Sequence, residues 1–155
     1  MADDRILKLQ KIINTLKDII EGIIVSRGYE ANLGRNVYDW KVTPFGQEQV
    51  PGVSIEDVFD LIRNEEQIIG LDTHILSINI KIKSFSDAET IRKIVDGDLY
   101  STFGETLNKT LDGLLEESIR WLGRSFDFEH KDKLIGSAEI NLELVYRTGQ
   151  FNPYE

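Results

Sequence analysis

The first apolar pattern in the chain has the period of an α-helix. Between residue 4 and about residue 26, isoleucine and leucine recur three or four positions apart. At about 100° per residue these positions fall within an arc of about 140°, the broad stripe of a helix packed on a core. They are Ile6, Leu9, Ile12, Ile13, Leu16, Ile19, Ile20, Ile23 and Ile24. Asp3 or Asp4 can cap this helix, and Gly28 can end it in a left-handed conformation.

The middle and the end of the chain change to the two-residue alternation of β-strands. Residues 73–85 form the clearest strand, and the closing run, residues 137–147, alternates in the same way. In the first of these, one face carries Leu76, Ile78, Ile80 and Ile82, and the other carries Ser77, Asn79, Lys81 and Lys83. We therefore expect one face of the sheet to be apolar and the other to meet water or a polar partner.

Shorter signals lie between the first helix and the clear strand. A strand fits residues 35–40, and residues 41–52 read as a loop because they contain two prolines and two glycines. A strand then restarts, with Val53 and Ile55 facing one way. Residues 59–71 fit a helical turn or a strand end, and the pattern leaves both open.

A second helix is predicted after the clear strand. Ser86 and Glu89 have the spacing of a capping box, and apolar residues follow at helical spacing. Gly97 and Gly104 weaken this helix, so we expect it to break before Leu107. Residues 114–130 then read as a strand that turns into the closing one.

The order of elements predicts an α+β fold. Strands joined by short turns should be antiparallel, and both helical stripes need a sheet face to pack on. We expect an antiparallel sheet of about four to five strands with two helices on one face. The chain of 155 residues forms one domain, residues 1–155, in which 148–155 is a C-terminal extension.

Composition narrows the classes of function. The formal net charge of -9 disfavours a surface that grips phosphates, so we expect no specific binding of nucleic acid. The chain has no cysteine, which removes disulfides and thiolate metal sites and suits a reducing cytoplasm. We expect no membrane partner, because no stretch is long and apolar enough to span a bilayer and the N-terminus lacks the basic residues of a secretory signal.

Catalytic chemistry finds little support in the residue pattern. His74 and His130 lie in different predicted hairpins, and neither has a partner at metal or triad spacing. Asp127, Glu129 and His130 form a third hypothesis, a small metalloenzyme, although in a strand His130 points away from the two acids. No phosphate-binding loop or nucleophile elbow occurs. We therefore expect no enzyme, no catalytic residue, no metal and no cofactor.

Aromatic residues outside the core pattern are more informative. Trp40 and Phe45 lie in or beside the long loop, and Phe151 and Tyr154 follow the last strand. Each can fold back on its own domain or serve as an interface anchor, since these residue types are enriched at binding hot spots. The candidate interface residues are Trp40, Phe45, Arg147, Phe151, Pro153 and Tyr154.

The order of elements and three segments carry a resemblance to a known family. The segments are YEANLGRNVYDW, VPGVSIED and the closing GSAEINLELVYRTGQFNPYE. Their most specific pieces are Pro51, Val53 and Ile55, and the ending from Val145 to Thr148 with Pro153 after it. Over residues 7–154 the chain resembles the tail terminator proteins of tailed bacteriophages, also described as minor tail or tail completion proteins.

This resemblance implies a structural virion protein. Such proteins form homo-oligomeric rings, usually hexamers, that cap the head-proximal end of the tail tube, stop its polymerisation and join the tail to the head connector. The implied partners are the tail tube protein and the head–tail connector or neck protein, with a sheath terminal ring as a further candidate. The protein would be assembled in the host cytoplasm and reside in the tail, with DNA passing through the ring.

An alternative from another class is a phage neck adaptor, or another non-enzymatic interaction module, that adds a strand to its partner through an exposed sheet edge. It would be monomeric or dimeric and would need no ring. For the ring, we expect the last strand to end the domain's own sheet and residues 151–154 to leave it and dock on another subunit.

Overall fold

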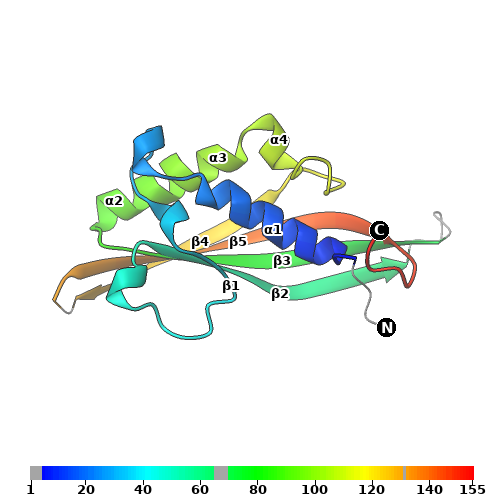
Figure 1. Cartoon of the computed structure of the whole chain (residues 1–155), viewed down its shortest axis with the longest axis horizontal. Helices are drawn as coiled ribbons and strands as arrows, with labels where there is room; N and C mark the ends of the chain where they lie inside the picture. The colour runs from blue at the N-terminus through cyan, green and yellow to red at the C-terminus, as the bar shows by residue number, and fades with distance from the viewer. Residues whose placement is uncertain (1–4, 65–69, 131) are drawn as a thin grey trace.

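The computed structural model describes residues 5–64, 70–130 and 132–155. It has the α+β fold class predicted, with helices covering one face of a five-stranded sheet (Figure 1). The strands are β1 (Val37–Asp39), β2 (Gly52–Asn64), β3 (Leu71–Ser84), β4 (Arg120–His130) and β5 (Leu134–Gly149). The helices are α1 (Lys8–Glu21), α2 (Ala88–Arg92), the π-helical η4 (Lys93–Tyr100), α3 (Ser101–Phe103) and α4 (Thr106–Lys109). Short 3-10 turns lie at Val25–Arg27, Leu33–Arg35 and Gln47–Gln49.

The sheet is mixed, which differs from the all-antiparallel prediction. Its order is β1-β2-β3-β5-β4, and β2, β3, β5 and β4 are antiparallel neighbours. The short β1 instead runs parallel to β2, pairing Val37 with Val53 and Asp39 with Ile55. The loop of residues 40–51 is long enough to carry the chain back to the same end of the sheet, so the rule for short turns does not apply here.

The first helix is shorter than predicted. α1 begins at Lys8 after Leu7, which gives no side-chain cap, and the predicted caps Asp3 and Asp4 lie outside the described residues. The stripe packs as expected: Ile12, Ile13, Leu16 and Ile20 are buried. The helix ends at Glu21 with Gly22 as its C-cap, not at Gly28 as predicted. Gly28 is left-handed as expected, with a φ of 94°, but it caps the 3-10 turn that follows.

The second helix runs through Gly97, where the pattern predicted weakness. α2, η4 and α3 follow one another from Ala88 to Phe103, and α4 is separate, so the expected break before Leu107 is present. The predicted strand at 114–130 is correct only from Arg120 onward. Leu115, which precedes β4, is buried but lies in an irregular segment rather than in a strand.

The cap of α2 is one residue later than the predicted capping box. Asp87, not Ser86, is the N-cap, and its Oδ1 accepts a hydrogen bond from the backbone N–H of Thr90 at 2.8 Å. Ser86 is buried, and its hydroxyl points to the carbonyl of Ser84. An aspartate at the N-cap serves the same helix end that the serine was expected to serve.

Replacing Asp87 by alanine should lower the melting temperature more at neutral pH than at about pH 2. The hydrogen bond from the Thr90 N–H stabilises the carboxylate and holds the pKa of Asp87 below its usual value of 3.8. A lowered folded-state pKa gives stability that is present above pH 3.8 and is lost as the pH falls through the folded pKa. Thermal melts at both pH values measure this. Asp87→Asn, which caps without titrating, is the control, and an equal effect of Asp87→Ala at both pH values would contradict the assignment.

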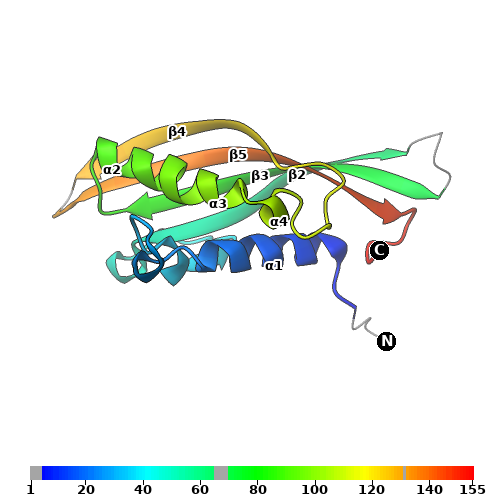
Figure 2. The same ribbon diagram turned by 90° about the horizontal axis from the view of Figure 1, so that it is seen from above.

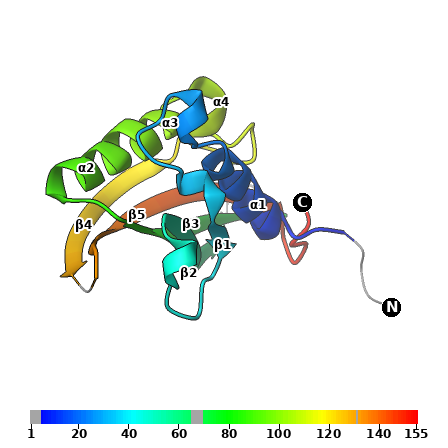
Figure 3. The same cartoon turned by 60° about the vertical axis from the view of Figure 1, so that its left-hand side comes forward.

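The core lies between the helices and one face of the sheet. α1 and the α2–α3 segment lie side by side over the strands (Figures 2 and 3), and the ends of β2 and β3 extend past them. The core-facing residues of β3 are the predicted Leu76, Ile78, Ile80 and Ile82, all buried. No helix among residues 5–64, 70–130 and 132–155 is long and apolar enough to cross a membrane.

The face of the sheet away from the helices, called the open face below, is polar as predicted. Its four predicted residues on β3 are Ser77, Asn79, Lys81 and Lys83. Three of them are already engaged with other strands of the chain. Asn79 donates to Glu139 at 3.0 Å, Lys81 pairs with Glu56 at 3.0 Å, and Lys83 lies 4.0 Å from Glu129 on β4, beyond β5.

Candidate functional site

The six predicted interface residues fall into two groups. Arg147, Phe151, Pro153 and Tyr154 lie together beside the start of α1, where the C-terminus is marked in Figure 1. Trp40 and Phe45 instead follow β1, in the loop that leads to β2. The structure therefore does not unite the six residues in one site.

The C-terminal turn, residues 149–155, folds back on its own domain. The Gly149 N–H donates to the Glu155 carbonyl at 2.7 Å, and the Gln150 N–H donates to the Gly70 carbonyl at 2.8 Å. Pro153 accepts a hydrogen bond from the Lys8 N–H at 2.9 Å. The expectation that the whole tail leaves the domain is therefore wrong, because its backbone groups find partners within the same chain.

Two residues of this end are held by the N-terminal segment. The Arg5 guanidinium lies over the Tyr154 ring, 4.2 Å from its centroid. The backbone carbonyl of Arg147 accepts a hydrogen bond from Lys8 Nζ at 2.6 Å. The Arg147 guanidinium lies 3.7 Å from the Glu116 carboxylate. Tyr154 and Arg147 thus have packing partners inside the described chain.

Phe151 is different, because its side chain is 94% exposed. Its φ of 57° lies in the left-handed region, which costs a residue with a side chain on the order of 1 kcal/mol. The surrounding hydrogen bonds of the turn fix that conformation. A large aromatic side chain is therefore held out in solvent by a rigid turn, which lowers the entropy cost of using it as an anchor.

The side chains of Trp40 and Phe45 are less exposed than that of Phe151. The Trp40 N–H donates to the Ile55 carbonyl at 3.0 Å, and its indole Nε1 donates to Asp57 Oδ1 at 2.6 Å. The ring is still 43% exposed. Phe45 is half-buried and packs edge-on against Tyr38, with ring centroids 5.9 Å apart.

A groove lies between the loop that carries Phe45 and the open face. Its volume is about 420 Å³, and it is lined by both apolar and charged side chains. Val42, Pro44, Phe45 and Phe126 supply the apolar part, and Lys41, Lys81, Lys83, Glu56, Asp127 and Glu139 supply the charges. The groove's volume and mixed lining are in the range of sites that take a ligand or a side chain of a partner.

The edge of β2 forms a second exposed surface. β1 pairs only with residues 53–55, so within the described chain the rest of β2 has a strand on one side alone. A β-bulge between Asp57 and Phe59 shifts the alternation there. Four apolar residues of this segment are exposed: Val58, Phe59, Leu61 and Ile62, with Phe59 at 60% and Ile62 at 55%. Residues 58–64 are called the bare edge below.

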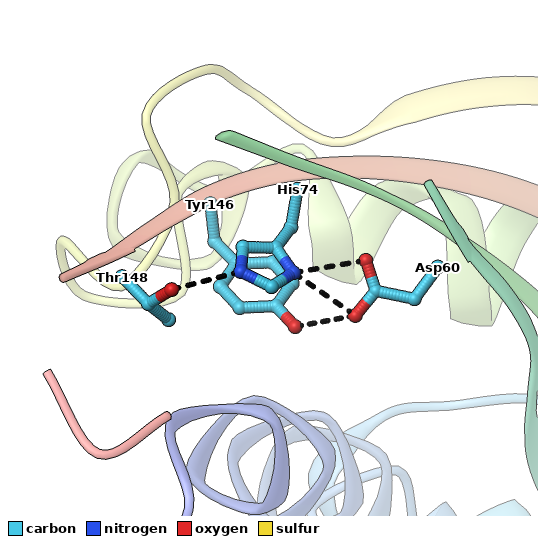
Figure 4. A network of polar contacts seen from close by, with 4 residues as sticks. All are labelled: Asp60, His74, Tyr146 and Thr148. Carbon is cyan, nitrogen blue, oxygen red and sulfur yellow. Dashed lines mark hydrogen bonds and ion pairs between the residues drawn. The ribbon is translucent and has the colours of Figure 1, made fainter. Parts of the chain in front are cut away.

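A buried polar network joins the bare edge to the two central strands (Figure 4). His74 Nδ1 lies 3.1 Å and 3.2 Å from the two carboxylate oxygens of Asp60, and its Nε2 lies 2.8 Å from Thr148 Oγ1. The Tyr146 hydroxyl donates to Asp60 Oδ2 at 2.6 Å, and its ring stacks on His74 with centroids 4.3 Å apart. The network therefore ties β2, β3 and β5 to one another.

All four polar groups can be satisfied with a neutral imidazole. A proton on Nδ1 is donated to Asp60, and Nε2 then accepts the Thr148 hydroxyl. Burial, together with the hydrogen bond to Asp60, raises the pKa of Tyr146 well above its usual value of 10.0. The hydroxyl therefore stays protonated as a donor. A raised pKa gives stability that is complete below pH 10.0 and declines at higher pH, because the unfolded tyrosine ionises first.

The order Thr148, His74, Asp60 matches that of a nucleophile, base and orienting acid. However, Thr148 and His74 are buried, and the Gly149 N–H, a candidate oxyanion donor, is bonded to Glu155. A substrate carbonyl needs access to the nucleophile and to the oxyanion donor, so the arrangement favours a structural role. The sequence shows no partner for His74 at metal or triad spacing, because Asp60 and Thr148 come from other strands that the sheet brings together.

The acids of the third hypothesis do not converge on His130. Glu129 lies near Lys83, and no group of three metal-ligand residues occurs in the part of the chain that the structure describes. Comparison with models of known protein families and with curated protein sequences gave no match. The candidate site is thus a set of surfaces: the C-terminal turn, the groove and the bare edge.

Proposed function

We propose that this chain forms a closed ring that caps the head-proximal end of a phage tail tube, stopping tube growth and joining the tail to the head connector. The sequence resemblance to tail terminator proteins suggests the role. The observation that carries it is Phe151, an aromatic side chain 94% exposed on a turn that is anchored to its own domain. Such a side chain is a ready anchor for a protein interface.

A ring requires two unlike patches on one molecule. In a heterologous interface one patch of a subunit meets a different patch of the next, and rotation closes the set. The C-terminal turn lies beside the start of α1, whereas the groove is lined by the loop after β1 and by β2, β3, β4 and β5. Two separate surfaces of unlike shape, one protruding and one hollowed, support this kind of contact.

Capping also constrains what the ring may expose. A tube subunit adds to its own kind indefinitely, because each addition presents the same face again. A terminator binds that face and offers no copy of it on its far side. The formal net charge of -9 suits a channel through which DNA passes without binding, since carboxylates repel phosphates.

Deletion of the gene from a producing phage tests the proposal. Electron microscopy of lysates should show overlong or unjoined tails beside separate DNA-filled heads, and added purified protein should restore joining. Tails of normal length attached to heads in the deletion strain would contradict the proposed role.

A strand-adding adaptor is the second candidate, and the bare edge favours it. An extended segment of a partner can extend a sheet at such an edge through main-chain hydrogen bonds. This function needs no ring. A chain that binds its neck partner in a one-to-one complex, and forms no closed ring on tubes, would fit the adaptor.

A further inference from the structure

The bare edge leaves backbone groups that another strand would satisfy. Trp40 marks where pairing with β1 ends, since its N–H bonds Ile55 and its indole bonds Asp57. Beyond it, no strand of the described chain lies on that side of β2. A long edge with exposed apolar side chains is a template for pairing with another chain, so its occupant should itself be a β-strand.

We propose that residues 57–63 of two copies pair antiparallel about a two-fold axis at Asp60. Within this segment, Val58-Phe59-Asp60-Leu61-Ile62 has nearly the same chemistry read in either direction, with apolar residues on both sides of Asp60. Antiparallel pairing sets Phe59 against Leu61 of the other copy and Val58 against Ile62. Aromatic and aliphatic pairs are cross-strand combinations that stabilise a sheet.

The bulge is compatible with this register. It lies before Phe59, so Phe59 and Leu61 share the open face and meet across the axis on that face. The bulge leaves Asp57 and Arg63 on opposite faces of β2, so the pairing rests on the apolar residues between them. The two ends of the paired segment are set by Trp40 on one side and by the end of β2 at Asn64 on the other.

At the two-fold axis, Asp60 of one copy lies opposite Asp60 of the other. Two like charges directly opposite each other oppose the pairing. The Asp60 carboxylate is held inward, away from the edge, by His74 and Tyr146 of its own copy. These hydrogen bonds keep the two charges turned from each other. The polar network thereby fixes the strand in a form that a second strand can meet.

The edge of β4 is a poorer partner for β2. Within one copy, β4 runs antiparallel to β2. If a second copy were added head to tail, β4 of one copy would therefore also run roughly antiparallel to β2 of the other. The acidic end of β4, with Asp127 and Glu129, would then meet the end of β2 that carries Glu56 and Asp57, or collide with β1. Charge and space both favour a second copy of β2.

The pairing is separate from the proposed ring. A two-fold contact cannot close a ring that has two different ends, so the dimer is the form of the unassembled chain. It would cover the apolar bare edge before assembly. The dimer can exist whether or not the protein caps a tube, so a failed capping test leaves this inference standing.

Cysteine cross-linking of the full chain tests the register, because the native sequence has no cysteine. A mixture of Phe59→Cys and Leu61→Cys chains should form a mixed disulfide rapidly under mild oxidation. Directly opposite residues lie about 5 Å apart between Cα atoms, within disulfide range, whereas Phe59 and its own copy lie diagonally, at about 8 Å. Each single variant alone should therefore cross-link more slowly than the mixture.

Leu122→Cys, on the exposed part of β4, is the matched control. Rapid cross-linking of Phe59→Cys with Leu122→Cys would overturn the two-fold dimer in favour of a head-to-tail contact. A mixture of Phe59→Cys and Leu61→Cys that cross-links no faster than Leu122→Cys alone would also overturn it.

A second measurement does not depend on oxidation. Sedimentation equilibrium should give a dimer for the native chain, and Phe59→Lys should weaken it by on the order of tenfold or more, because lysine at an edge opposes pairing. Phe59 is exposed, so the variant should stay folded. Leu122→Lys should leave the dimer unchanged. A monomeric native chain, or equal dimerisation of Phe59→Lys, would contradict the proposal.

Discussion

Replacing Tyr146 by alanine should lower the free energy of unfolding by about 3–5 kcal/mol. The side chain is 2% exposed, stacks on His74 and donates to Asp60, so the change opens a cavity and removes a hydrogen bond together. Tyr146→Phe keeps the ring and should cost about 1–2 kcal/mol, the share of the hydroxyl. Denaturant titration at neutral pH measures both values.

Tyr100→Ala is the matched control for Tyr146. Tyr100 also contacts another ring, meeting Trp121 edge-on at 5.0 Å, but it is 54% exposed. Its replacement should cost less than about 1.5 kcal/mol. If Tyr146→Phe is as stable as the native protein, the hydrogen bond to Asp60 does not stabilise the fold.

Replacing Phe151 by serine should weaken ring assembly by on the order of 30-fold to 1,000-fold, as expected for a hot-spot residue worth about 2–4 kcal/mol. The melting temperature should change little, because the side chain contributes almost no buried surface within its own domain. Complementation of the deletion phage by the variant, scored as joined particles, measures the loss.

Phe128→Ser is the control for Phe151, since Phe128 is a partly exposed phenylalanine on β4, away from the turn. It should complement normally. Truncation after Thr148 is a less specific change, because it also removes the contacts of Pro153 with Lys8 and of Tyr154 with Arg5. Full complementation by Phe151→Ser would show that Phe151 is not an interface anchor.

The sequence predicted the parts of the fold that depend on local periodicity. The stripe of α1 and the alternation of β3 and β5 each determine which side chains are buried, because a helix or strand with one apolar face has one stable orientation. The bulge in β2 could not be predicted from this pattern. It shifts the alternation between Asp57 and Phe59, and it leaves residues 59–64 without a clear strand period.

The parallel pairing of β1 and the polar network were beyond local rules. His74 and Thr148 were visible as polar residues at core-facing positions of two apolar strands, which was a usable signal. Their partner Asp60 lies 14 residues from His74 and 86 residues from Tyr146, so only the sheet order brings them together. The fold-back of the tail likewise depends on Lys8, at the other end of the chain.

The most direct measurement of the central claim is electron microscopy of tail tubes assembled in the presence of this protein. The purified tail tube protein of the same phage should polymerise until the chain is added, and then stop. The account predicts a closed ring of this protein at one end of each tube and none at the other. Tubes that continue to grow without a terminal ring, or that carry the protein at both ends, would contradict it.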